Sequence, residues 1–306
     1  IKAIQANPGE PALPWRKSGN PLWLPVNALT GNRYNGINIV SLWVAAETAG
    51  YAAPLWATYK QWQQLDAQVR KGERANPVVF YRHYDTDPDP DDPDDDGKRR
   101  VARASWVFNC AQVEGYTPPP QLEPLGPIQR IFDADRFFAA IGARIVHGGQ
   151  EACYRPSTDT IHMPDECLFT GSSTMTRSEA YFAVLAHEHI HYTGHPSRLD
   201  RDFGKRFTSA ARAMEELCAE LGSAFLCAEL GITQDVRADH AQYLASWVQL
   251  LKDQPKAIFA AAARASEAVK YLHALQHPGP RTGPAAMAAG PAALAEAGMP
   301  ISGVVP

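Results

Sequence analysis

Apolar residues in the first part of the chain recur with the spacings of strands and short helices. Runs rich in β-branched and aromatic residues at 78–84 and 101–108 predict two strands. An apolar run over 39–49 that ends at a glycine predicts a helix. Residues 54–59 predict a short strand, and residues 60–68 predict a short helix. This part of the chain therefore predicts a small α+β domain.

A second set of apolar segments predicts a small sheet and several helices. The predicted strands are 143–146, 152–154 and 160–164, and the predicted helices include 131–141, 239–252 and 256–275. The proline-rich stretch 118–128 separates the two sets and is typical of a linker. We therefore expect an α+β protein with two domains, 1–117 and 129–277, and a Pro/Gly/Ala-rich tail at 278–306 with little structure of its own.

The composition is that of a soluble globular protein. The 306 residues are 45% hydrophobic and 20% charged. No apolar run approaches the 18 residues that a membrane span requires. The five cysteines are scattered and form no C-x-x-C pair, which favours reduced thiols and a cytoplasmic location.

Charge is distributed unevenly along the first hundred residues. Residues 1–84 hold nine Lys/Arg and four Asp/Glu, a net charge of +5, whereas residues 85–100 hold three and eight, a net charge of −5. The Asp/Pro run at 85–97 lacks the spacing of a calcium loop, so a flexible acidic loop is the preferred interpretation. This loop could shield the basic surface that precedes it.

Aromatic residues are concentrated in the same basic region. Six of the seven tryptophans lie within the first 106 residues. Aromatic rings interleaved with cations suit single-stranded nucleic acid, because bases stack on the rings while the cations follow the phosphates. The alternative is that most of these rings form the core of a small domain. The candidate DNA-binding residues are Arg33, Tyr34, Asn35, Trp56, Tyr59, Lys60, Arg70 and Lys71.

The strongest chemical signal is the H-E-x-x-H pattern from His187 to His191. A spacing of four residues places both imidazoles on one face of a helix, where they can share a metal ion. Glu188 is then the candidate general base for a water on that metal. A capping box at 176–179 predicts where this helix begins, and Gly194 predicts where it ends. Alternatively, the histidines only decorate a helix end.

A catalytic zinc site needs a third protein ligand. His195, Asp200 and Glu216 are the candidates, and Glu216 is preferred because it lies in a second strong helix, 25 residues after His191. Glu220, one turn later, is expected to accept the outer N–H of a ligand histidine. Zinc is the default metal for this set, although manganese or another divalent ion could occupy it.

Three further residues lie in or next to the motif. Tyr192 and His195 are candidates to stabilise an oxyanion during peptide hydrolysis. His189 faces away from the histidine pair and is interpreted as a surface or inter-domain residue.

Several longer motifs resemble those of ArdC-type antirestriction proteins, whose relatives include the N-terminal part of plasmid TraC primases. In the first half they are P-x-N-x-x-T-G-x-x-Y-x-G-I-N at 25–38, W-x-T-Y-K-Q at 56–61, V-R-K-G-E at 69–73 and V-F-N at 107–109. In the second half they are H-G-G at 147–149, I-x-M-P at 161–164, H-E-x-x-H-x-x-G-H at 187–195 and E-E-x-x-A-E at 215–220. His189 and the acidic loop depart from the family pattern.

The resemblance implies a single-stranded-DNA-binding domain joined to a zincin-like metallopeptidase domain, in a plasmid-borne factor that protects conjugated DNA from host restriction. A host restriction or other defence protein is then a candidate peptide substrate. Two alternatives remain open: a DNA-covering protein whose metal site is structural, and a cytoplasmic zinc peptidase without a DNA role.

Overall fold

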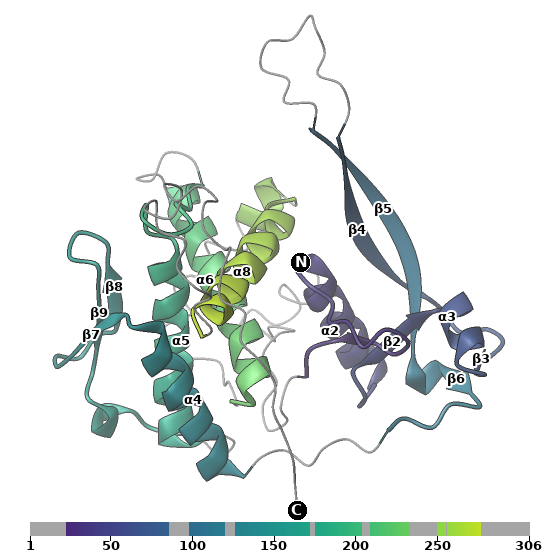
Figure 1. The fold of residues 1–306 in the computed structure, drawn as a ribbon, viewed down its shortest axis with the longest axis horizontal. Coiled ribbons are helices and arrows are strands. Elements are labelled where there is room, and N and C mark those ends of the chain that lie inside the picture. The colour runs from purple at the N-terminus through teal and green to yellow at the C-terminus, as the bar shows by residue number, and fades with distance from the viewer. Residues whose placement is uncertain are drawn as a thin grey trace, which may run out of the picture. The chain divides into compact units, whose positions relative to one another are not determined.

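The computed structural model (Figure 1) describes residues 23–85, 98–119, 126–171, 175–203, 209–232, 250–254 and 256–276. Residues 86–97 of the predicted acidic loop, most of the predicted linker and helix 239–252, and the tail 278–306 lie outside these ranges. No helix within the described ranges is long and apolar enough to cross a membrane.

A four-stranded sheet organises the first half of the chain. Its order is β1 (Val26–Asn27), β2 (Leu55–Thr58), β5 (Lys98–Asn109) and β4 (Asn76–Asp85). Strands β4 and β5 confirm the predicted strand pair and form the long antiparallel ribbon in Figure 1, in register from Asn76↔Val107 to Asp85↔Lys98. Strand β1 pairs with β2 in parallel, and β2 pairs with β5 in antiparallel orientation.

Helix α2 (Ile37–Ala49) packs on this sheet and confirms the predicted helix. The buried Asn38 side chain donates to the Val79 carbonyl and accepts from the Val79 N–H, both at 2.8 Å, which fixes α2 against β4. Gly50 ends the helix in the left-handed conformation that glycine adopts without strain.

Helix α3 and a two-stranded sheet follow β2 in the first half of the chain. Helix α3 (Tyr59–Gln64) starts at a capping box on Thr58 and is shorter than predicted, because the chain enters β3 (Gln68–Val69) four residues later. Strand β3 pairs with β6 (Val113–Glu114), which follows the 3-10 turn Cys110–Gln112.

The second half contains a three-stranded sheet and four described helices. The strands are β7 (Arg144–His147), β9 (Thr160–Met163) and β8 (Cys153–Arg155) in that spatial order, with β7 parallel and β8 antiparallel to β9. The helices are α4 (Pro127–Ile141), α5 (Arg177–Thr193), α6 (Ser209–Leu230) and α8 (Ala257–Ala274). A 3-10 turn at Glu166–Leu168 leads towards α5. Helix α5 contacts β8 and β9 as well as α4, α6 and α8, so it is the central element of this half.

The described residues from 23 to 276 form one compact unit. Its largest hydrophobic core contains residues of α5, α6 and α8 together with Ile39, Val40 and Trp43 of α2. The Trp43 ring lies 5.7 Å from the Phe225 ring of α6. The architecture is therefore mixed α+β, as predicted.

Gly222 allows α5 and α6 to approach closely. A Cβ atom at this position would lie 2.8 Å from Cδ1 of Ile190. Overpacking costs about 1–3 kcal/mol, while alanine favours a helix over glycine by about 1 kcal/mol. We expect Gly222→Ala to lower the free energy of unfolding, measured in urea, by about 1 kcal/mol.

Ile190→Ala provides the matched test because it removes Cδ1, Cγ1 and Cγ2, which would lie 2.8, 2.9 and 3.1 Å from the added Cβ. The double variant should lose less stability than the sum of the two single variants. Additive losses would show that close packing does not select glycine here.

Candidate metal centre

Helix α5 presents the H-E-x-x-H residues to a cleft. Its N-terminus has the predicted capping box, in which the Thr176 hydroxyl accepts from the Glu179 N–H and the Glu179 carboxylate accepts from the Thr176 N–H. The helix places His187 and His191 on the same face, with ring centroids 4.8 Å apart. The cleft has a volume of about 880 Å³ and is lined by both histidines, Glu188 and residues of β8 and α6.

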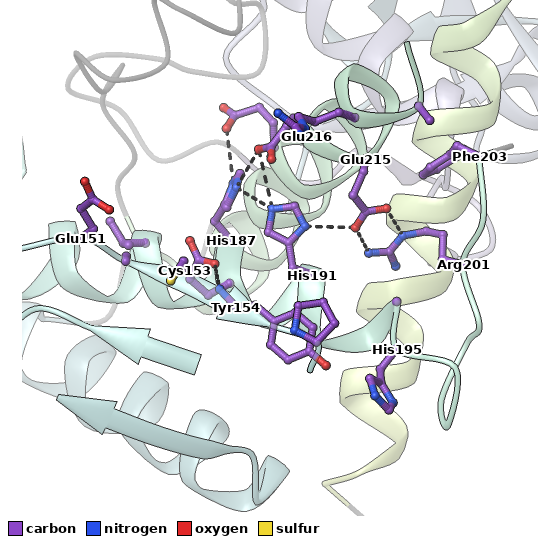
Figure 2. A pocket seen from close by; sticks show the side chains of 18 of the residues that line it. Glu151, Cys153, Tyr154, His187, His191, His195, Arg201, Phe203, Glu215 and Glu216 are labelled. Atoms are coloured by element: carbon purple, nitrogen blue, oxygen red, sulfur yellow. Dashed lines mark hydrogen bonds and ion pairs between the residues drawn. The ribbon is translucent and has the colours of Figure 1, made fainter. Parts of the chain in front are cut away.

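Helix α6 brings Glu216 to the histidine pair (Figure 2). Its Oε2 atom lies 3.5 Å from Nε2 of His187 and 3.7 Å from Nε2 of His191. The two Nε2 atoms are 3.1 Å apart. Among the described residues, these three form the group whose possible ligand atoms all lie within 4.8 Å of one another. Two imidazoles and a carboxylate that converge from facing helices match the donor set of an open zinc site.

The electrostatics of the three side chains also favour a cation. Burial alone would lower the pKa of His191, but its hydrogen bonds to Glu215 and Glu216 and their charges raise it well above its usual value. Burial would raise the pKa of Glu216, but hydrogen bonds from His187 and His191 hold it well below its usual range. Because the local carboxylates stabilise positive charge at this point, a divalent ion fits the site.

The sequence indicated Glu220 but not Glu215 as a neighbour of the histidines. Glu220 is fully buried, with Oε2 3.8 Å from Nδ1 of His187. Glu215 forms the shorter contact, 3.0 Å between its Oε1 atom and Nδ1 of His191. Arg201 binds Glu215 through two nitrogens and lies in a loop with no recognisable motif. In the sequence, the only indication that Glu215 lies near the site is its position directly before Glu216.

Glu188 is held by the edge strand of the small sheet. One of its carboxylate oxygens accepts from the Tyr154 N–H at 2.8 Å, and only 6% of the residue is exposed. The Tyr154 hydroxyl in turn donates to Asp159 and accepts from Arg198, both of which also pair with each other. The hydrogen bond from Arg198 lowers the pKa of Asp159 to about 2. This charged pair therefore fixes β8 beside the candidate base.

The other candidate residues of the motif lie in different surroundings. His195 lines the cleft, and its Nδ1 atom contacts the Ser197 hydroxyl at 2.7 Å. Tyr192 is not among the described residues that line the cleft, and the Arg198 guanidinium lies 3.6 Å from its ring centroid. Of the two candidates for oxyanion stabilisation, His195 is the one that lines the cleft.

His189 is not a surface residue, which corrects its interpretation from the sequence. Its ring is fully buried and packs 4.8 Å from the Phe138 ring of α4. Burial lowers its pKa to about 4, so the ring is neutral at pH 7. Its Nδ1 atom contacts the Leu185 carbonyl at 2.8 Å, which allows a polar ring to replace an apolar one on the inner face of α5.

Two of the candidate DNA-binding residues belong to the core instead. Tyr34 is 6% exposed and Trp56 is 1% exposed, so neither ring is available to stack on a base. The remaining candidates are at the surface: Arg33, Asn35, Tyr59, Lys60, Arg70 and Lys71. Of these, Arg33 pairs with Glu229, and Arg70 pairs with Glu73 and the Ala111 carbonyl.

An exposed tryptophan on the β4–β5 ribbon was missed. Trp106 is 59% exposed, whereas its neighbour Val107 is 1% exposed. Alternation along a strand explains this difference, because Val107 points into the core that contains Trp56 and Trp106 points to the opposite face. Strict alternation of inward-facing and outward-facing residues along β5 would have predicted that Trp106 is exposed.

Comparison with known proteins agrees with both halves of this description. Residues 1–108 match the family model of the N-terminal domain of anti-restriction factor ArdC, and residues 132–264 match that of a zincin-like metallopeptidase. The y4eC protein of Sinorhizobium fredii is 47% identical over 281 residues, which cover 90% of this chain and 89% of y4eC. The DNA primase TraC of Escherichia coli is 38% identical over 285 residues, but the chain spans only 25% of its length.

Solved structures give the same result. The metal-free crystal structure of antirestriction ArdC from plasmid R388 has a TM-score of 0.70 and 37% sequence identity, with 90% of this chain and 93% of that chain covered. The Mn(II)-bound structure of the same protein has a TM-score of 0.69 and 36% identity. The chain therefore belongs to the ArdC antirestriction family.

Proposed function

We propose that the protein binds single-stranded DNA and protects incoming DNA from host restriction, and that it carries a divalent metal site. The observation that carries the proposal is the 37% identity that extends over 93% of the R388 ArdC chain. Both halves of that chain thus have counterparts here. The same relationship supports a plasmid origin and a role during conjugation.

The surface of the first half supports single-strand binding. Trp106 and Tyr59 are exposed aromatic rings on which bases can stack, and Lys60 and Lys71 are exposed cations that can follow phosphates. Arg33 and Arg70 contribute less to this surface, because each already pairs with a glutamate.

His187, His191 and Glu216 would hold the metal ion, with zinc as the expected ion. The Mn(II)-bound structure of R388 ArdC supports a divalent metal in this family. Such an ion would act as a Lewis acid and lower the pKa of a water molecule in the cleft. Glu188, fixed by the Tyr154 N–H, would accept a proton from the attacking water and return it to the departing amine. His195 would donate a hydrogen bond to the oxyanion that forms when water adds to the peptide carbonyl.

Restriction of incoming plasmid DNA in cells tests the proposal. We expect the double variant Lys60→Glu/Lys71→Glu to lose most of the protection, because the introduced negative charges repel the phosphates. The affinity of this variant for single strands should also depend less steeply on salt concentration than that of the wild type, because fewer cations contact phosphates. Arg70 is left unchanged because it also supports a turn. A variant that no longer binds single strands but still protects would contradict the DNA-binding role, whereas a variant that binds and protects like the wild type would exclude Lys60 and Lys71 as the DNA contacts.

Glu188→Gln in the same assay separates the catalytic and structural alternatives. If this variant binds metal and single strands but fails to protect, peptide hydrolysis is part of protection, and a host defence protein is the substrate to seek. If it protects fully, DNA covering is sufficient and the metal site stabilises the fold or serves another task.

A further inference from the structure

Arg201 lies at the end of a chain of polar contacts that leads to the candidate metal site (Figure 2). Its side chain is 1% exposed, so the guanidinium is a buried permanent charge that requires partners. Nε and Nη2 donate to the two oxygens of Glu215, at 2.8 and 2.5 Å. Oε1 of Glu215 lies 3.0 Å from Nδ1 of His191. Arg201 thus reaches a candidate ligand through one carboxylate.

The same guanidinium also binds the last turn of α5. Nη1 donates to the Thr193 hydroxyl and Nη2 donates to the Ile190 carbonyl, both at 2.8 Å. Gly194 leaves room for this contact, because a Cβ atom there would lie 2.9 Å from Nη2. The guanidinium is therefore fixed relative to the helix that carries His191, and it holds the Glu215 carboxylate in one plane.

The orientation of Glu215 determines which nitrogen of His191 is available for a metal. Both ring nitrogens face a carboxylate, but Oε1 of Glu215 lies 3.0 Å from Nδ1, nearer than the 3.7 Å between Oε2 of Glu216 and Nε2. The neutral ring therefore keeps its proton on Nδ1 and presents the lone pair of Nε2. Nε2 is the atom that faces His187 and Glu216. Nδ1 of His187 lies 3.8 Å from Oε2 of Glu220, a longer distance than the 3.0 Å between Nδ1 of His191 and Oε1 of Glu215.

We propose that Arg201 and Glu215 are positioning residues, which set the tautomer and the ring orientation of His191 for a divalent cation. The proposal rests on the metal site of the proposed function. It assigns a role to an arginine outside both the H-E-x-x-H and the E-E-x-x-A-E motifs. Loss of an outer hydrogen-bond partner of a metal ligand typically weakens metal affinity by about 10–100-fold.

Titration of the purified full chain with Mn²⁺ is the first test. We expect Arg201→Met and Glu215→Ala to weaken binding by about 10–100-fold. Glu215→Gln keeps an oxygen acceptor for Nδ1 and should recover much of that loss. Arg201→Lys keeps the positive charge but lacks the planar guanidinium that binds both carboxylate oxygens, so its affinity for Mn²⁺ should lie between those of the wild type and Arg201→Met. If the folded Arg201 variants bind Mn²⁺ within about twofold of the wild type, the proposal is wrong.

Arg130→Met is the matched control for general loss of stability. Arg130 also forms a buried ion pair, 3.3 Å from Glu179, but this pair does not reach the metal site. Its removal should destabilise the fold without changing the affinity for Mn²⁺. An equal loss of affinity in Arg130→Met would indicate that Arg201 acts only through stability.

Long-range ¹H–¹⁵N spectra of the metal-free protein give a second readout. Recorded at alkaline pH, where the ring is neutral, they should show His191 protonated on Nδ1 in the wild type and in Glu215→Gln, and a mixture of tautomers in Glu215→Ala. A wild-type ring protonated on Nε2 would overturn the proposal. If the wild type bound neither Mn²⁺ nor Zn²⁺, the metal-site proposal would fail, while these spectra would still decide whether Glu215 sets the tautomer.

Discussion

Glu216→Ala should abolish tight divalent-metal binding while leaving the protein folded. Glu216 is the carboxylate whose oxygen lies 3.5 and 3.7 Å from the two histidine nitrogens, so its removal leaves only two ligands. Loss of a ligand should exceed the effect of losing an outer hydrogen-bond partner, so we expect affinity to fall by about 100-fold or more. Calorimetric titration with Zn²⁺ and Mn²⁺ measures this directly.

Thermal unfolding provides an independent measurement of the same loss. A ligand at about 100 times its Kd stabilises the native state by about 2.7 kcal/mol. The wild type should gain this stability when Mn²⁺ is added, and Glu216→Ala should gain almost none at the same concentration. Glu151→Ala is the matched control, because Glu151 lines the cleft but lies outside the three-residue group. Wild-type affinity in Glu216→Ala would instead favour His195 or Asp200 as the third ligand.

The parts of the site that could be predicted from the sequence depend on local geometry. Helical spacing alone placed His187 and His191 on one face, and the capping box at Thr176 predicted the start of α5. The strands β7, β8 and β9 were likewise visible as short apolar segments between turns. Such signals are contained within a few consecutive residues, so no knowledge of tertiary packing was needed.

The parts that were missed depend on contacts between distant segments. Whether Glu215 or Glu220 approaches a histidine is decided by the rotation of α6 against α5, which Gly222 permits and no single helix reveals. Arg201 becomes significant only because its loop folds back on the end of α5. His189 was interpreted as a surface or inter-domain residue because it faces away from the histidine pair, but α4 covers that side of the helix. In each case the neighbouring element, rather than the residue type, determines the role.

The aromatic residues of the first half present the same difficulty, since composition cannot separate a core ring from a stacking ring. Trp56 and Trp106 differ in this respect, and we expect opposite results when each is replaced by alanine. Trp56→Ala should lower the free energy of unfolding by about 3–5 kcal/mol, because the ring is fully buried and packs against Tyr51 at 5.8 Å. Trp106→Ala should change it by less than about 0.5 kcal/mol, because most of the ring is in solvent. Urea unfolding followed by circular dichroism measures both values.

For the affinity towards a single-stranded oligonucleotide we expect the opposite: Trp106→Ala should have the large effect and Trp56→Ala the small one. Base stacking on an exposed aromatic ring contributes about 1–3 kcal/mol per base, so Trp106→Ala should weaken binding by about tenfold or more. Trp106→Phe retains a ring and should lose much less. Trp56→Ala, measured where it remains folded, should bind close to the wild-type level, because its ring never meets the solvent. If Trp106→Ala bound single strands like the wild type, the exposed face of the β4–β5 ribbon would not be the stacking surface, and the contact would have to be sought around Tyr59 and Lys60 at the start of α3.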